Sequence, residues 1–180
     1  MGRGWMAGLY IAVAVHAWQT DRCRLPPHDD AVAVAPHNPP IPMEHATMDT
    51  AALIRAYYAA FNRADFEGMI ALLGDDVVHD ANQGSRHVGK DWFRGFLAHM
   101  DRCYSEQVVD LVVLTEAAGT RVAAEFVIEG EYKVTDEGLP PARGQRYRLP
   151  VGAFFEVHDG LIRRVTNYYN LQDWIAQVSA

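Results

Sequence analysis

The spacing of apolar residues changes part-way along this chain, and this change most constrains its fold. From residue 49 to about 104 the apolar residues recur mainly every three to four positions, and from residue 107 they alternate. The first period is typical of helices and the second of strands. We expect helices over residues 51–65, 65–76 and 89–104, the first capped by Asp49 or Thr50.

Alternating segments then predict a run of strands. Two of them flank a turn at Gly119, and two more are joined by His158-Asp159-Gly160, in which Asp-Gly is typical of a hairpin. A short strand at residues 77–80 precedes the third helix. Helices followed by antiparallel strands indicate an α+β fold, in which three N-terminal helices pack on a curved, mostly antiparallel sheet. Such a sheet encloses a pocket, which is the usual ligand site.

The first 47 residues differ in composition, because they contain six of the nine prolines. We expect a flexible, Pro-rich lead over residues 1–47 and one domain over residues 48–180. The apolar stretch 5–18 is too short to span a membrane, for which about 20 residues are needed. It is either a weak secretory signal or part of an upstream extension before Met48. We expect a cytoplasmic protein, or an exported one if the stretch is a signal.

Charge and cysteine content narrow the classes of partner. The formal net charge of −7 comes without a basic stripe, which argues against nucleic acid and anionic membranes as partners. The two cysteines, Cys23 and Cys103, form no metal-binding spacing, and we expect free thiols. His79, His87 and His99 match no established ligand motif. We therefore expect no metal and no cofactor.

Four segments resemble a known family: "YYAAFNRADFEGMIALLGDDV", "HDANQGSRHVGKDWFRGFL", "GEYKVTDEGLPPARGQRYRLPVGAFFEVHDGLIRRV" and "TNYYNLQDW". Through them, residues 50–175 resemble the nuclear transport factor 2-like superfamily, in particular the ketosteroid isomerases and the SnoaL-like polyketide cyclases. The resemblance implies an α+β cone. It does not fix the chemistry, because isomerases, cyclases, hydrolases and binding modules share this fold.

The resemblance also suggests functional residues. Tyr57 falls at the oxyanion-binding tyrosine of the isomerases and Asp80 at their proton-transferring base. Gly152 occupies the place of their neutral aspartic acid, so one oxyanion donor is missing. Asn167 stands where the cyclases and epoxide-hydrolase-like proteins have an aspartate, and Glu125 lies near an inward arginine of the hydrolase-like pattern.

These residue types suit proton transfer at a carbon next to a carbonyl. A carboxylate such as Asp80 can take the proton if apolar surroundings raise its pKa, and a phenol such as Tyr57 can stabilise the oxyanion. Asp80 could equally end the strand in an Asx-turn. Strand alternation places Asn167 and Tyr169 on one face. The family's orientation would direct this face and Glu125 into the cone, where Glu125 is a second candidate base. Asn82, Trp92 and Phe61 complete the expected substrate-binding set.

The sequence leaves two functions open. The first is an isomerase- or cyclase-type enzyme that acts on a small hydrophobic carbonyl compound. The second is a non-catalytic module that binds an apolar ligand or serves as a dimeric scaffold. We expect a homodimer, because an apolar outer sheet face, to which we assign Phe126, Ile128 and Phe154, usually marks an interface.

Overall fold

A computed structural model describes residues 49–82 and 84–180. The predicted lead over residues 1–47, with Cys23 and the stretch 5–18, lies outside the described residues. No helix within the described part of the chain is long and apolar enough to cross a membrane. The elements are α1 (Thr50–Asn62), α2 (Phe66–Ala71), β1 (Leu73–Asp80), β2 (Arg86–Val88), α3 (Lys90–Cys103), β3 (Tyr104–Thr115), β4 (Arg121–Tyr132), β5 (Gln145–His158), β6 (Leu161–Tyr169) and α4 (Leu171–Ser179).

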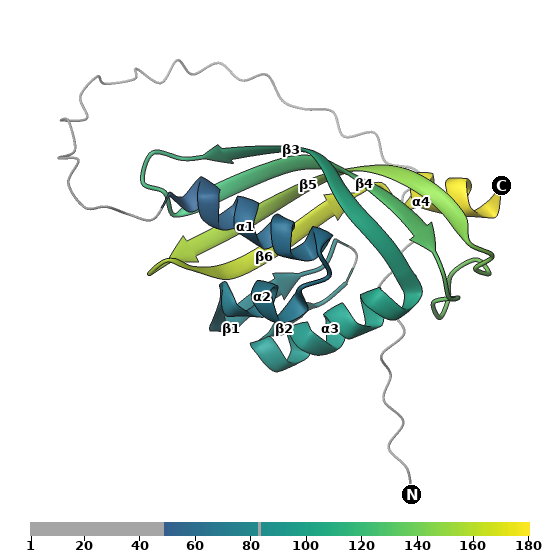
Figure 1. The fold of residues 1–180 in the computed structure, drawn as a ribbon, viewed down its shortest axis with the longest axis horizontal. Coiled ribbons are helices and arrows are strands. Elements are labelled where there is room, and N and C mark those ends of the chain that lie inside the picture. The colour runs from purple at the N-terminus through teal and green to yellow at the C-terminus, as the bar shows by residue number, and fades with distance from the viewer. Residues whose placement is uncertain (1–48, 83) are drawn as a thin grey trace, which may run out of the picture. The chain divides into compact units, whose positions relative to one another are not determined.

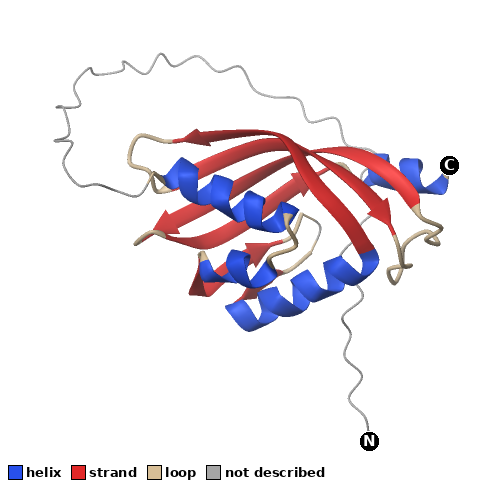
Figure 2. Cartoon of the chain, viewed as in Figure 1, coloured by secondary structure: helices blue, strands red, loops and turns tan. Residues whose placement is uncertain are grey.

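The strands form one six-stranded sheet in the order β2-β1-β6-β5-β4-β3. Strands β1 and β6 are parallel, and every other neighbouring pair is antiparallel. Helices α1, α2 and α3 gather on one side of this sheet and α4 lies at its end (Figures 1 and 2). The predicted α+β cone is therefore confirmed. The short strand β2 and helix α4 were not predicted.

Local sequence explains several of the boundaries. The Asp49 side chain accepts a hydrogen bond from the backbone N–H of Ala51 at 3.1 Å and so caps α1, as predicted. Asp159 and Gly160 form the two-residue loop between β5 and β6, with φ of 55° and 71°. Positive φ at both positions is the geometry of the tight hairpin turn that Asp-Gly favours.

The sheet curves because its strands contain irregular pairings. The pairing register of β3 with β4 shifts between Val109 and Val112, and Asp110, which lies between these two residues, has a positive φ of 56°. An extra residue in one strand bends it and increases its twist. Figure 1 shows β3 and β4 bending together along their length. This curvature gives the inner face of the sheet a hollow that the helices cover.

Burial alternates along β4 and identifies the inner face. Phe126 and Ile128 are buried on the face that the helices cover, whereas Glu125, which precedes Phe126, is exposed on the opposite face. The expectation that Phe126 and Ile128 lie on the outer face is wrong, because the alternation is shifted by one residue. Phe154 of β5 does lie outside, with 47% of its surface exposed.

Candidate active site

A cavity of about 650 Å³ lies between the inner face of the sheet and the helices. This volume is typical of pockets for small organic ligands. Most of its walls are apolar or aromatic, with contributions from α1, α3, α4 and strands β1, β3, β4, β5 and β6. This cavity corresponds to the apolar pocket that the sequence predicts.

Six of the eight predicted site residues line this cavity: Tyr57, Phe61, Asn82, Trp92, Asn167 and Tyr169. Tyr57 is buried on α1, and burial raises the pKa of its hydroxyl, which keeps it a neutral hydrogen-bond donor. Asn82 donates from Nδ2 to the backbone carbonyl of Tyr169 at 2.7 Å. That bond ties the loop after β1 to the end of β6. The predicted inward direction of Asn167 and Tyr169 is confirmed.

Asp80 does not line the cavity. Asp80 pairs with Thr166 of β6, and Thr166 pairs with Phe154 of β5. Because paired residues share a face of the sheet and Phe154 is exposed, Asp80 lies on the outer face. Arg86 donates to both carboxylate oxygens, at 2.8 and 2.9 Å. These bonds hold the pKa of Asp80 below its ordinary value. The expectation of a raised pKa in an apolar pocket is wrong, since the residue that β1 directs inward at this point is His79.

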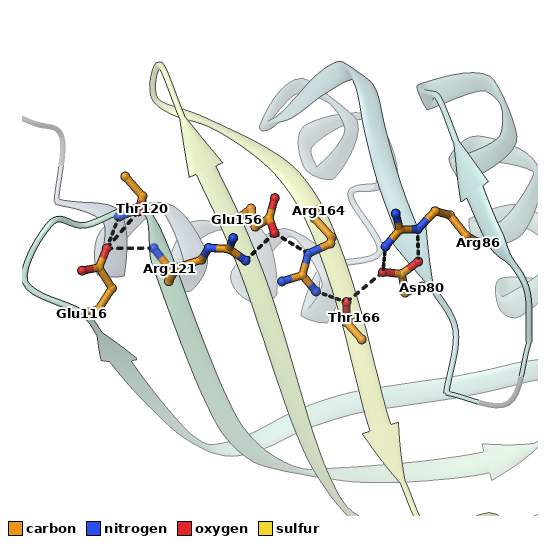
Figure 3. A network of polar contacts seen from close by, with 8 residues as sticks. All are labelled: Asp80, Arg86, Glu116, Thr120, Arg121, Glu156, Arg164 and Thr166. Atoms are coloured by element: carbon orange, nitrogen blue, oxygen red, sulfur yellow. Dashed lines mark hydrogen bonds and ion pairs between the residues drawn. The ribbon is translucent and has the colours of Figure 1, made fainter. Parts of the chain in front are cut away.

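Figure 3 shows that Asp80 belongs to a chain of polar contacts across the outer face. Thr166 approaches Asp80 at 3.5 Å, and Arg164 links Thr166 to Glu156. Arg121 pairs with the same Glu156. With Arg86 of β2 included, charges of both signs therefore compensate one another over five strands. These contacts give Asp80 a structural role on the outer face of the sheet.

Glu125 and Gly152 also lie on this outer face, where they are neighbours in register. The predicted inward direction of Glu125 is wrong, because Glu125 is exposed and the inward residues beside it are Ala124 and Phe126. A Cβ added at Gly152 would meet no atom within 4 Å. An acid at that position would therefore point away from the cavity.

A carboxyl group that the sequence reading missed does line the cavity. Glu106 of β3 accepts a hydrogen bond from the Tyr147 hydroxyl at 2.5 Å. Burial raises the pKa of Glu106, and the bond from Tyr147 partly opposes that rise. A carboxyl that acts as a general base near neutral pH needs a raised pKa, and apolar surroundings give it one.

Gly130 makes this pair possible. Glu106, Gly130 and Tyr147 are direct neighbours across β3, β4 and β5. Because Gly130 has no side chain, the Tyr147 ring lies over it and reaches Glu106 one strand further. A Cβ at Gly130 would stand 2.3 Å from Tyr147 Cζ and 2.6 Å from its hydroxyl oxygen.

A second buried carboxyl, Asp136, lies between β4 and β5 and also lines the cavity. Tyr104 donates to its Oδ2 at 3.0 Å, and His99 Nε2 lies 3.0 Å from the same oxygen. Arg102 approaches His99 Nδ1 at 3.1 Å. A guanidinium can only donate, so Nδ1 accepts and Nε2 carries the proton that binds Asp136.

The two carboxyls share one region of the cavity. Burial raises the pKa of Tyr169 to about 12, and both Glu106 and Asp136 add to that rise. Trp174 of α4 packs edge-on against Tyr104 and Tyr147, with ring centroids 6.1 and 5.9 Å away. Helix α4 therefore closes the region in which the two acids lie.

The groups around Asp136 include three side-chain types that bind metals. Ligand atoms of His99, Cys103 and Asp136 lie within 4.8 Å of one another. However, His99 Nε2 donates its proton to Asp136, and His99 Nδ1 accepts a hydrogen bond from Arg102. A metal at Nε2 would require loss of that proton and would add positive charge beside Arg102. The geometry thus suits a hydrogen-bonded cluster better than a coordination shell.

The cone fold with a lined cavity defines a nuclear transport factor 2-like protein. The model of the SnoaL-like domain matches residues 54–165. The chain therefore belongs to the SnoaL-like domain family.

Several solved structures are similar to this chain. A candidate polyketide cyclase from Pseudomonas putida is 55% identical, with a TM-score of 0.72, over 73% of this chain and 99% of that one. A candidate polyketide cyclase from Xanthomonas campestris is 57% identical, with a TM-score of 0.71, over 72% and 96%. An epoxide hydrolase of the LEH-like type from M. tuberculosis is 22% identical with a TM-score of 0.60 over 74% and 86%, which supports the fold alone. No curated protein matches the sequence.

Proposed function

We propose that this protein is a small-molecule enzyme of the isomerase or cyclase type, with Glu106 as the general base. The observation that carries the proposal is the Glu106 carboxyl, which lines an apolar cavity, accepts a bond from Tyr147 and has a raised pKa. The names of the relatives from Pseudomonas and Xanthomonas support a reaction of the cyclase type. The substrate would be a hydrophobic compound with a carbonyl group.

In the proposed step, the Glu106 carboxylate takes a proton from the carbon next to the substrate carbonyl. The electron pair of that C–H bond moves into the adjacent bond and places negative charge on the carbonyl oxygen. The neutral hydroxyl of Tyr57 would donate to that oxygen, and the amide of Asn167 would orient it. Return of the proton from Glu106 to another carbon of a conjugated enolate completes an isomerisation. For ring closure, the enolate carbon bonds to the carbon of a second carbonyl within the substrate, the electron pair of that C=O bond moves to its oxygen, and this oxygen takes the proton from Glu106.

Tyr147 has a positioning role in this proposal. Its hydroxyl fixes one oxygen of Glu106 and leaves the other free to approach the substrate. Burial and the nearby Glu106 both raise the pKa of Tyr147, so the phenol stays protonated while Glu106 changes charge. The base is therefore held in one orientation throughout the step.

Conversion of a β,γ-unsaturated ketosteroid to its conjugated enone, followed by ultraviolet absorbance, tests the proposal. Replacement Glu106→Gln should lower the rate by at least about 100-fold, the usual contribution of a general base. Glu125→Gln is the matched control, because Glu125 is an exposed glutamate on the other face, and its rate should equal that of the wild type. A Glu106→Gln rate equal to the wild-type rate would refute the role of Glu106.

A non-catalytic binding module is the second candidate. It is favoured by Asn167, an amide that cannot accept a proton, at a position where the resemblance to the cyclases implies an aspartate. Wild-type protein that binds a hydrophobic ligand without converting any carbonyl compound would support this alternative.

We also propose that two copies associate through the outer sheet face. Val112, Leu114, Phe154 and Tyr168 are exposed there by 47–61%. The patch borders the chain of alternating charges in Figure 3, and a surface with both signs can pair with itself about a two-fold axis.

A further inference from the structure

We infer that the cavity has a separate recognition subsite, centred on His79, for a hydroxyl group on an uncharged, flat ring compound. This inference rests on the cavity being the ligand site of the proposed function, but not on catalysis by Glu106. It would add a substrate class to that function.

The first observation is a buried imidazole without a partner. His79 of β1 is 2% exposed and lines the cavity, and neither of its ring nitrogens makes a hydrogen bond to any residue within 49–82 or 84–180. A buried polar group without a partner destabilises the folded state, and most such groups in proteins are paired. A ligand in the cavity would supply the missing partner.

A second group of the same kind lines the same cavity. The Tyr58 hydroxyl on α1 is buried and has no hydrogen-bond partner in the part of the chain that the structure describes, and its ring lies 4.8 Å from that of Phe126. Two unpartnered polar groups therefore face one apolar space from a helix and a strand. This recurrence is difficult to explain by packing, whereas a ligand with two polar groups would satisfy both.

The ionisation of these groups points to an uncharged ligand. Burial lowers the pKa of His79 to about 4, so its ring is neutral and offers one donor and one acceptor. A hydroxyl also offers one donor and one acceptor and can therefore match either nitrogen, whereas a carboxylate offers only acceptors. Among the described residues that line the cavity there is no Lys or Arg to neutralise an anion.

The walls around His79 indicate the shape of the ligand. Trp92 and Phe96 of α3 are nearly parallel, with an interplanar angle of 10° and centroids 5.5 Å apart. Both rings lie next to His79, at 5.4 and 4.7 Å. Trp92 is also stacked on His87, with ring centroids 4.0 Å apart, so the wall beside His79 is a stack of flat rings. Such a wall favours a flat ring, which can meet it edge-on.

Two probes of similar size separate hydroxyl recognition from apolar burial: 2-naphthol and 2-methylnaphthalene. Dissociation constants of both are measured by fluorescence titration for the wild type, His79→Phe and His158→Phe. The ratio of the naphthol constant to the methylnaphthalene constant cancels differences in ring packing. This ratio should rise about tenfold in His79→Phe, the effect of one lost hydrogen bond. His158 is exposed on the β5–β6 hairpin, so His158→Phe should keep the wild-type ratio.

An unchanged ratio in His79→Phe would overturn the inference, and so would a wild type that binds neither probe. Spectra of wild-type protein with 15N-labelled histidine keep the test decisive if the variant fails to fold. The His79 ring nitrogens should shift with 2-naphthol but not with 2-methylnaphthalene, and equal spectra would also refute the subsite. Neither probe carries a carbonyl group on which the proposed reaction could act, so binding is measured without turnover and a failure of catalysis is distinguishable from a failure of recognition.

Discussion

Replacement of Gly130 by alanine tests the arrangement that presents Glu106 to the cavity. The new Cβ would stand 2.3 Å from Tyr147 Cζ, which no real side chain tolerates, so the Tyr147 ring must move. Gly130 has no positive φ, and the backbone itself accepts alanine. The effect of Gly130→Ala therefore reports on the ring alone.

Two contributions set the expected magnitude. Displacement of a packed ring costs about 1–3 kcal/mol. Loss of the bond from the Tyr147 hydroxyl to Glu106 costs about 1–3 kcal/mol more, since it leaves a partly buried carboxyl without its donor. We expect Gly130→Ala to lower the free energy of unfolding by about 3 kcal/mol, measured by urea denaturation as a lower midpoint at unchanged slope.

Gly152→Ala is the matched control on the neighbouring strand. Its Cβ would meet no atom within 4 Å, so stability should stay the same or rise by about 0.5 kcal/mol. In a Tyr147→Ala background the Gly130→Ala penalty should largely vanish, because the clashing ring is gone. Equal stabilities of the Gly130→Ala and Gly152→Ala proteins would refute the reasoning.

Three further predictions concern pH and association. Because the fold favours the protonated carboxyl of Glu106, the wild type should lose stability as the pH rises from the ordinary Glu pKa near 4.5 through the raised pKa of Glu106. Denaturation curves of Glu106→Gln should lack this loss. His79 acts oppositely: its pKa falls from 6.5 to about 4, so acidification across this window should cost on the order of 3 kcal/mol, and His79→Phe should remove that dependence. Phe154→Asp should convert a dimer into a monomer in analytical ultracentrifugation, and an unchanged sedimentation coefficient would exclude this face as the interface.

Much of the architecture could be predicted from sequence because the underlying signals are local. Asp49 caps α1, and Asp159-Gly160 adopts the hairpin turn that this pair favours. Helix α4 was missed because its nine residues carry only a short apolar pattern. Tertiary packing decides its position, since Trp174 packs against aromatic rings from distant strands.

The candidate site was less predictable because a strand shows its period but not its inner face. A shift of one residue exchanges Asp80 for His79 and Glu125 for Phe126 at the cavity wall. Glu106 shares its alternation with the buried Tyr104 and Val108, and that pattern could have indicated an inward carboxyl. The contact with Tyr147 could not be foreseen, since it crosses Gly130 on the strand between them.

The most direct test of the central claim is proton exchange at a carbon next to a ketone. Loss of the methylene proton signals of 2-tetralone in D₂O, followed by NMR, reports base catalysis without knowledge of the natural substrate. Wild-type protein and Asp80→Asn should exchange these protons at equal rates, and Glu106→Gln should fall to the rate without protein. Rapid exchange in Glu106→Gln, together with its loss in Asp80→Asn, would contradict the assignment of the base to the cavity face of the sheet.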